Sequence, residues 1–199
     1  MAEPLKNVYD KTFLNDLAKR VARFKPDFSR PTFVKRVMAD SWDELELKAR
    51  MYRISDCLHS CLAMDFISAV EVLTNVARDY RDDGKTGFEY MFLPDFVEKH
   101  GRDHFKVAME SLSAMTETGS AEFAIRPFIL QAENKTLKQM QRWAKDKDLH
   151  KRRLASEGCR PRLPWAMALP KFKADPAPIL PILEQLKTDP SEYVRRSVA

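Results

Sequence analysis

Apolar residues recur at helical spacing through the first hundred residues. One stripe steps along the chain as one face of an amphipathic helix does, and it comprises Leu47, Met51, Ile54, Leu58 and Cys61. Similar stripes predict helices over 12–24 and 65–79, and a further helix with Pro31 in its first turn. Ser41–Glu44 has the pattern of a capping box, which predicts the start of the helix that carries the first stripe. We expect all these stripes to pack into a core.

Two segments interrupt the helical pattern. Arg81–Lys85 is polar and predicts a turn. Residues 88–97 are rich in aromatic side chains but contain Pro94, so they predict a buried connection between helices. His100 and His104 flank another break, and we interpret them as capping or surface residues.

The second half of the chain contains a repeat. Three apolar segments align on one arginine each: 124–129 on Arg126, 150–155 on Arg152 and 193–198 on Arg195. Each follows an earlier amphipathic segment and a polar turn, which predicts a helix–turn–helix unit that occurs three times. Such units bury their apolar faces by stacking into a solenoid. An insertion over 159–176, rich in Pro and basic residues, lengthens the second interval, and such a loop is a natural place for function.

The composition fits a helical globular protein. Of 199 residues, 44% are hydrophobic, 32% are charged and only five are glycine. The low glycine count favours helices over a β-sandwich or barrel, and the apolar fraction excludes a disordered chain. No apolar run approaches the roughly 18 residues that span a bilayer. Residues 1–13 lack the apolar core of a signal peptide, so we expect a cytoplasmic protein.

The cysteines do not indicate a disulfide framework or a metal site. There are three, an odd number in a Cys-poor chain. Cys57 and Cys61 lie four residues apart with His59 between them, but a metal site needs more ligands at fixed spacings. We interpret these side chains as buried thiols, and we expect neither a metal nor a cofactor.

Positive charge is concentrated in one segment. Residues 150–173 hold seven Lys or Arg and one Glu, a net charge of +6, whereas the whole chain carries +5. This local charge predicts a surface that binds phosphates. The single acid, Glu157, directly precedes Gly158 at an expected helix end, where the helix dipole disfavours a negative charge. Glu157 is therefore a candidate functional carboxylate, and pairing with Arg153 is its structural alternative.

Three runs in the second half resemble the AlkC-type DNA alkylation-repair glycosylases, which are related to the AlkD-type enzymes and are built from HEAT-like helical repeats. The runs are Ser120–Ile129, Arg152–Ala166 and Glu192–Ala199. The motif RRLASEGCRPRLPW within the second run is specific, whereas VRR in the third is not. Residues 1–6 and 87–96 are also similar, so the resemblance covers essentially the whole chain.

The fold class that we predict is an all-α solenoid of HEAT-like hairpins. We expect one domain over 1–199, with N-terminal helices over 1–101 and the Arg-marked repeats over 102–199. No capping sequence closes the last repeat, and members of the family continue past Ala199 with a further acidic site residue. We therefore expect the domain to extend beyond this chain, and we expect a monomer.

The resemblance implies an enzyme that binds double-stranded DNA and hydrolyses the N-glycosidic bond of cationic N3-alkylated bases without fully flipping the base. It implies that Glu122 and Glu157 are catalytic carboxylates that stabilise an oxocarbenium-like sugar, and that Trp165 contacts the lesion. We expect a set of cations to bind the DNA backbone: Arg126, Arg152, Arg153, Arg160, Arg162, Lys171, Lys173, Arg195 and Arg196.

The site assignments have structural alternatives. Glu122 precedes Arg126 by four residues, the spacing of a helical ion pair. Trp165 is alternatively a hydrophobic plug that pins the insertion, and Trp143 is expected in the core. The repeat register separates Glu122 from Glu157 by roughly 13 Å along a helix axis, which fits one groove only if the helices splay or the alignment shifts. The alternative function is a non-catalytic helical-repeat protein that binds DNA or an acidic protein.

Overall fold

The fold is entirely helical in the part of the chain that the structure describes. A computed structural model covers residues 3–199 and contains twelve α-helices, four short 3₁₀ helices and no strand in that range. The α-helices are α1 (Lys11–Phe24), α2 (Arg30–Val37), α3 (Leu47–Leu62), α4 (Phe66–Asp82), α5 (Phe92–His100), α6 (Phe105–Met115), α7 (Ile125–Gln131), α8 (Glu133–Trp143), α9 (Leu149–Gly158), α10 (Pro170–Ala174), α11 (Leu180–Leu186) and α12 (Glu192–Val198). The 3₁₀ helices are η1 (Leu5–Val8), η2 (Trp42–Glu44), η3 (Phe88–Tyr90) and η4 (Ala177–Ile179). The predicted all-α class is confirmed; residues 1 and 2 of the predicted domain lie outside the described range.

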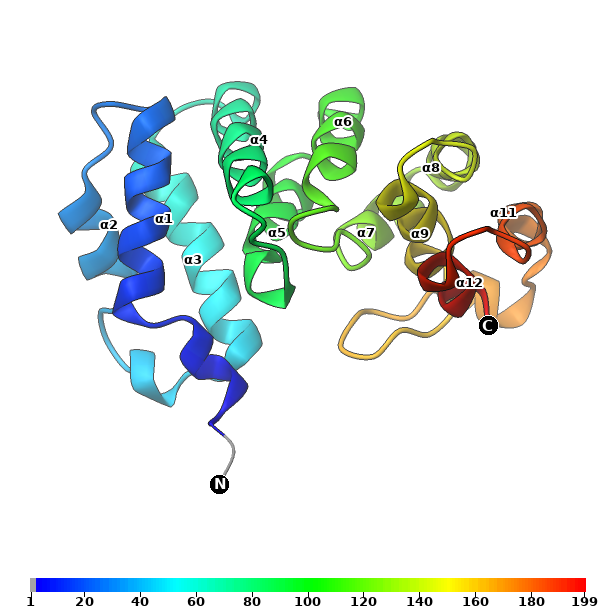
Figure 1. The fold of residues 1–199 in the computed structure, drawn as a ribbon, viewed down its shortest axis with the longest axis horizontal. Helices are drawn as coiled ribbons and strands as arrows, with labels where there is room; N and C mark the ends of the chain where they lie inside the picture. The colour runs from blue at the N-terminus through cyan, green and yellow to red at the C-terminus, as the bar shows by residue number, and fades with distance from the viewer. Residues whose placement is uncertain (1–2) are drawn as a thin grey trace.

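The helices from α3 onward form two stacked rows (Figure 1). In one row α4 packs on α6, and α8 packs on α11. In the other row α3 packs on α5, α5 on α7 and α9 on α12. The N-terminal helix α1 packs on α4, and α2 lies beyond it at the end of the stack, packed on α1 and α3 (Figure 1). This arrangement is that of the predicted solenoid, in which each unit buries its apolar face against the next.

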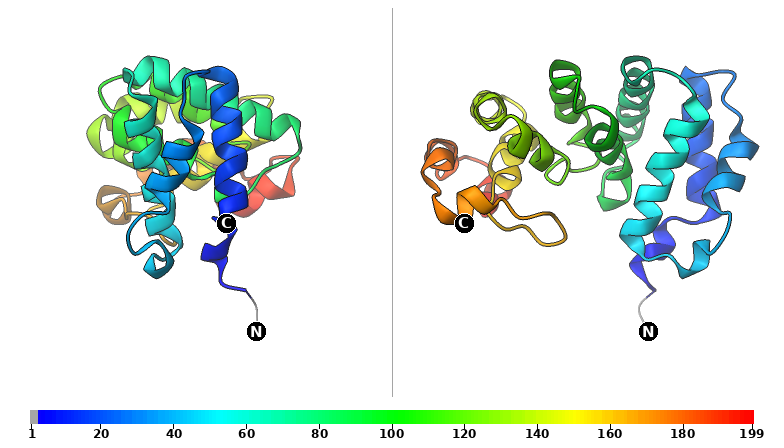
Figure 2. Two further views of the ribbon diagram at one scale, coloured as in Figure 1. Left: turned by 90° about the vertical axis from the view of Figure 1, so that its left-hand side faces the viewer. Right: turned by 180° about the vertical axis from the view of Figure 1, so that it is seen from behind.

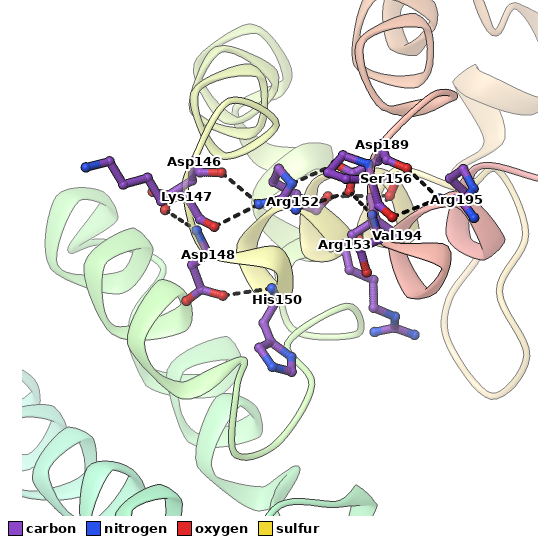
Figure 3. Close-up of polar contacts among 12 residues, drawn as sticks. Asp146, Lys147, Asp148, His150, Arg152, Arg153, Ser156, Asp189, Val194 and Arg195 are labelled. Atoms are coloured by element: carbon purple, nitrogen blue, oxygen red, sulfur yellow. Dashed lines mark hydrogen bonds and ion pairs between the residues drawn. The ribbon is translucent and has the colours of Figure 1, made fainter.

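The second and third repeats share a hydrogen-bond pattern at their marker arginines (Figure 3). Nη1 of Arg152 donates to the carbonyl oxygens six and five residues earlier, at 3.0 and 2.9 Å. Nη1 of Arg195 does the same at 2.6 and 3.0 Å. Arg152 also makes two contacts with the carboxylate of Asp189 in the next repeat, at 2.7 and 3.1 Å. Arg152 and Arg195 therefore tie their helices to the turns that precede them, and Arg152 also joins two repeats.

Two of the predicted helices begin where the sequence indicates. Helices α1 and α4 confirm the predictions over 12–24 and 65–79. Each has an aspartate at its N-cap, Asp10 or Asp65, whose side chain accepts a hydrogen bond from the amide three residues later, at 2.7 and 3.1 Å. This contact satisfies a backbone donor that the first helical turn leaves free.

Two local predictions are wrong. The capping box does not form, because Ser41 has a left-handed backbone with a φ of 39° and its side chain caps nothing. A 3₁₀ helix follows it, and α3 begins only at Leu47. Residues 88–97 are not a plain connection, since α5 already begins at Phe92. Pro94 is tolerated there because it lies in the first turn, where the missing amide hydrogen is not needed.

One hydrophobic core runs along the whole stack, from α1 to α12. Trp143 is buried, as predicted, with 4% of its surface exposed. Cys159 is buried as well, but Cys57 and Cys61 are only half-buried, so the expectation of buried thiols holds for them only in part. All three are free thiols.

Two kinds of feature are missing from residues 3–199. No helix there combines the length and the apolar character needed to cross a bilayer. No group of three or more His, Cys, Asp and Glu side chains in that range is arranged to hold a metal ion.

The insertion leaves the stacked rows as a long loop. Figures 1 and 2 show it projecting from the end of α9 toward the N-terminal helices, in gold and orange. Within the predicted insertion, residues 159–169 form the loop and the short helix α10 follows. The repeat then resumes at η4 and α11.

Candidate functional site

Glu122 and Glu157 lie on either side of the Arg153 guanidinium. Nη1 of Arg153 is 3.1 Å from Oε2 of Glu122, and Nη2 is 3.8 Å from Oε2 of Glu157. Both carboxylate side chains are largely buried, with 12% and 10% of their surface exposed. The separation of about 13 Å expected for two helical positions does not arise. Glu122 lies in the turn before α7, outside any regular helix, and Glu157 lies near the end of α9.

The contacts show which of the ion pairs considered for the two acids are present. The helical ion pair between Glu122 and Arg126 does not form, because Glu122 contacts Arg153 instead. The alternative pairing of Glu157 with Arg153 is present, and Arg160 adds a second contact at 3.3 Å. Two guanidinium groups therefore hold the carboxylates in fixed orientations next to each other.

Arg153 is fixed by further contacts. Its Nη1 donates to Oγ of Ser120 at 2.7 Å, and its guanidinium lies 5.0 Å from the centre of the Tyr193 ring. Burial acts to lower the pKa of Arg153, but the negative charges of Glu122 and Glu157 outweigh it and raise this pKa above its ordinary value. Arg153 therefore stays a cation between the two acids.

A hollow of about 260 Å³ opens beside this cluster. Its lining includes Glu122, Arg153, Tyr193 and His150. The rings of His150 and Tyr193 meet edge to face with their centres 5.8 Å apart. Burial raises the pKa of Tyr193, so its phenol is neutral at physiological pH. The hollow thus combines a carboxylate with aromatic walls and a hydroxyl group.

Trp165 lies in a tight turn at the tip of the insertion. The amide of Ala166 donates to the carbonyl of Leu163 at 3.2 Å, and Trp165 has a φ of 66°. With Pro164 before it, this geometry matches a type II turn, whose third position usually holds glycine. Trp165 is 62% exposed, so the alternative of a hydrophobic plug is wrong. A strained backbone that presents an exposed aromatic side chain is typical of functional sites.

Arg126 does not have the role expected of it. It is fully buried, and its guanidinium donates to carbonyl oxygens in and next to the insertion, at 2.5 Å from Met167, 3.2 Å from Gly158, 2.8 Å from Arg160 and 3.5 Å from Pro161. Burial lowers the pKa of Arg126. Expecting this residue to bind a DNA phosphate is wrong, because the side chain has no free surface. Arg126 holds the two arms of the insertion together at their base.

Arg152 is also largely committed to the protein. Its bonds to Asp189 and to two carbonyl oxygens use most of its donors, and 14% of its side chain is exposed. The hydrogen bond from Arg152 lowers the pKa of Asp189, so the acid stays ionised and the pair stays charged. Few hydrogen-bond donors and little exposed surface of Arg152 therefore remain for contact with a DNA phosphate.

The other cations expected to bind DNA are more accessible. Lys171 and Arg196 are exposed and pair with Glu133 and Glu192, at 3.1 and 2.7 Å. Exposed pairs of this kind contribute little and exchange partners readily. Four more cations are partly or fully exposed on the insertion or α12: Arg160, Arg162, Lys173 and Arg195. Within residues 3–199, Arg162 and Lys173 have no carboxylate within 4 Å.

Two further residues, Glu98 and Lys48, were not singled out as site candidates from the sequence. Glu98 on α5 lines a small crevice with Tyr52 and Phe123. Burial, together with the charge of Asp95, raises the pKa of Glu98 to about 7. The predicted connection over 88–97 ends one residue before Glu98, so the sequence pattern predicted no helix face for this position. Lys48, at the start of α3, donates a hydrogen bond to the carbonyl oxygen of Trp165 in the insertion.

The comparisons with known proteins bear on the sequence and the fold of the chain. No protein-family model matches the chain. The chain is 38% identical over 195 residues to a protein of Bacillus subtilis (strain 168) called "Uncharacterized protein YhaZ", and the match covers 98% of this chain and 53% of that protein. It is also similar to the solved structure of Pseudomonas fluorescens alkylpurine DNA glycosylase AlkC bound to DNA containing an abasic site analog. That match has a TM-score of 0.92 and 40% identity, over 98% of this chain and 53% of the other. The chain thus spans about half the length of the relatives it matches.

Proposed function

We propose, from the premise that this chain is closely similar in sequence and fold to an AlkC-type alkylpurine DNA glycosylase, that it takes part in the repair of alkylated DNA. The reaction is hydrolysis of the N-glycosidic bond of cationic N3-alkylated bases in duplex DNA. Because the substrate is chromosomal DNA, we propose the bacterial cytoplasm as the place of action.

One observation carries this proposal: two largely buried carboxylates contact the same guanidinium, and one of them, Glu122, lines a hollow. Glu122 and Glu157 come from different parts of the chain and converge on Arg153. Arg153 contacts both acids and Arg160 contacts Glu157 as well, so both carboxylates are held in place near a surface rich in cations. Negative charge held in this way stabilises a positive charge that develops next to it, because the surroundings are already oriented.

The proposed chemistry needs that negative charge. Alkylation at a ring nitrogen makes the base cationic and a good leaving group. As the bond from C1′ to the base nitrogen breaks, its electron pair neutralises the base, and the sugar becomes an oxocarbenium-like cation. Water then adds to C1′, and Glu122 or Glu157 accepts the proton that the water loses. The products are a free base and an abasic site.

We assign Trp165 to the lesion. Its indole is exposed at the tip of the insertion and is free to pack on a base or sugar from outside the helix stack. A base contacted in this way need not be fully extruded into a pocket, which supports the expectation of hydrolysis without full base flipping.

A base-release assay tests the proposal directly. We expect the chain to release N3-methyladenine from methylated duplex DNA faster than spontaneous depurination does. The matched control is the double variant Glu122→Gln/Glu157→Gln, which keeps the shape of both side chains and removes both charges. Release at the spontaneous rate by folded wild-type protein contradicts the proposal. DNA binding without release supports the alternative, a non-catalytic DNA-binding repeat protein.

The salt dependence of DNA binding is expected to identify the phosphate contacts. Arg162 and Lys173 are exposed cations without a carboxylate partner in the described range. Replacing both with alanine should weaken duplex binding and flatten the slope of log affinity against log salt by about 0.9 for each phosphate that is no longer neutralised. Fluorescence anisotropy with an undamaged duplex at several salt concentrations measures both quantities.

The control for this experiment is a pair of lysines elsewhere. Lys138 on α8 and Lys145, two residues after the end of α8, are also exposed. Both lie outside the insertion. The variant Lys138→Ala/Lys145→Ala changes the net charge equally and should leave the slope close to that of the wild type. Equal effects of the two double variants would mean that binding depends on net charge and not on the insertion.

A further inference from the structure

We propose that Lys48 is a positioning residue that holds the Trp165 turn against the N-terminal half of the protein. The inference rests on the proposed function, because it concerns how the indole is placed toward the lesion. It starts from a contact between residues 117 positions apart: Nζ of Lys48 donates to the carbonyl oxygen of Trp165 at 2.5 Å. The insertion projects toward the N-terminal helices in two views of the fold (Figures 1 and 2), which agrees with this contact.

Other contacts also lie close to the tip of the insertion: Leu163 is buried, Arg126 bonds to the Met167 carbonyl, and a few backbone hydrogen bonds add to them. The turn contains one internal hydrogen bond, from the Ala166 amide to the Leu163 carbonyl, and the Leu169 amide bonds to the Pro161 carbonyl nearer the base. Trp165 occupies the left-handed position of the turn, which a side chain of this size rarely adopts. Such a conformation persists where the surroundings restrain it. The Lys48 bond to the carbonyl of this same residue is a restraint of the kind required.

Lys48 has an unusual environment for a lysine. It is half-buried and is the second residue of α3, where the helix dipole disfavours a positive charge. Within residues 3–199 no carboxylate lies within 4 Å of its ammonium group. The ammonium instead lies 5.4 Å from the centre of the Tyr52 ring and 5.5 Å from that of Phe123. Two aromatic faces and a carbonyl oxygen therefore stabilise the charge, and the carboxylate of Glu98 attracts it from beyond 4 Å.

The same contacts connect the indole to the acid cluster. Phe123 directly follows Glu122 in the chain, so the ammonium of Lys48 lies between the segment that carries this carboxylate and the turn that carries Trp165. Without Lys48, the Trp165 turn loses its hydrogen bond to α3, and with it the link to the segment that carries Glu122. Displacement by about 1 Å of a group that positions a substrate is enough to slow a reaction by up to roughly 10²-fold. Lys48 thus sets the place of the indole relative to Glu122.

Fluorescence quenching tests this role without any enzymatic reaction. Trp42 and Trp143 are buried, at 5% and 4% exposed, whereas Trp165 is 62% exposed, so acrylamide quenching reports chiefly on Trp165. We expect Lys48→Met to increase the quenching constant and to lower the emission anisotropy, because it keeps the length of the side chain and removes its donor. Lys48→Arg, which keeps a donor, should lie closer to the wild type. Lys138→Met is the matched control.

Kinetics and binding complete the test. We expect Lys48→Met to slow single-turnover base release about tenfold while the salt slope of binding to undamaged DNA stays unchanged. A slope flattened by about 0.9 with unchanged quenching would overturn the proposal, because it identifies Lys48 as a phosphate contact. Unchanged quenching and unchanged rate would overturn it too. Increased quenching in a protein that releases no base supports the tether and refutes the proposed function alone, so the two failures are distinguishable.

Discussion

Replacing Glu157 with glutamine is expected to lower the rate of base release by roughly 10²–10³-fold, as the loss of one well-placed electrostatic stabiliser does. The substitution keeps the size of the side chain and removes the negative charge that faces the developing sugar cation. DNA affinity should stay equal or rise slightly. Arg153 and Arg160, which contact the carboxylate in the free protein, lose a competitor for phosphates. Single-turnover base release and binding to undamaged duplex measure the two effects.

A structural role for Glu157 predicts a different result. Because the carboxylate is 10% exposed and contacts two arginines, its loss would then lower the melting temperature and weaken binding. Activity would fall only in proportion to the folded fraction. Full activity per folded molecule in Glu157→Gln would exclude the catalytic assignment. Glu122→Gln is expected to act in the same direction but more mildly, and its carboxylate contacts the same Arg153.

Hydrophobic periodicity was sufficient to predict the helical fold and the repeat. The stripes over 12–24 and 65–79 have aspartates where N-caps form, so local chemistry and apolar pattern agree there. The predictions that failed concern residues whose backbone conformation depends on tertiary packing. Ser41 adopts a left-handed φ instead of capping a helix, and Pro94 lies inside a helix whose start no sequence signal marks.

The candidate site was predictable in its residues but not in its geometry. Charge density drew attention to Glu157 and to the arginines near it. The approach of Glu122 depends on the conformation of a turn before α7, which a helical register cannot supply. The role of Arg126 could not be predicted either. Nothing in the sequence indicates that its guanidinium is buried and bonds to carbonyl oxygens 32 to 41 residues away.

Burial therefore separates the arginines into two classes that the sequence does not distinguish. Arg126 and Arg152 stabilise the fold, because carbonyl oxygens and Asp189 take up their donors. Arg162 is exposed and has no carboxylate partner in the described range, which leaves it free for phosphates. The net charge of +6 over residues 150–173 thus overstates the number of cations available to DNA, because it includes Arg152, and exposure is the better guide.

Replacing Arg126 with methionine is expected to destabilise the protein by about 2–4 kcal/mol, the range for leaving buried polar groups without partners. Its guanidinium donates to four carbonyl oxygens at the base of the insertion, and methionine can donate to none of them. The melting temperature should fall by roughly 10 °C in a chain of this size. Removing a buried cation relieves some desolvation, as the lowered pKa of Arg126 indicates, but four unpaired carbonyl groups outweigh that gain.

The same variant should also loosen the insertion below its melting temperature. Gly158, Arg160 and Met167 lie at the base of the loop that carries Trp165, and Arg126 is the donor they share. Acrylamide quenching of Trp165 should therefore rise, and base release should fall, in protein that is still folded by circular dichroism. Arg162→Met is the matched control, because it makes the same exchange at an exposed position of the same insertion. If Arg126→Met melts like this control, its hydrogen bonds contribute little. The expectation of a larger effect follows from burial, since a carbonyl group that loses its partner in the interior has no water to replace it.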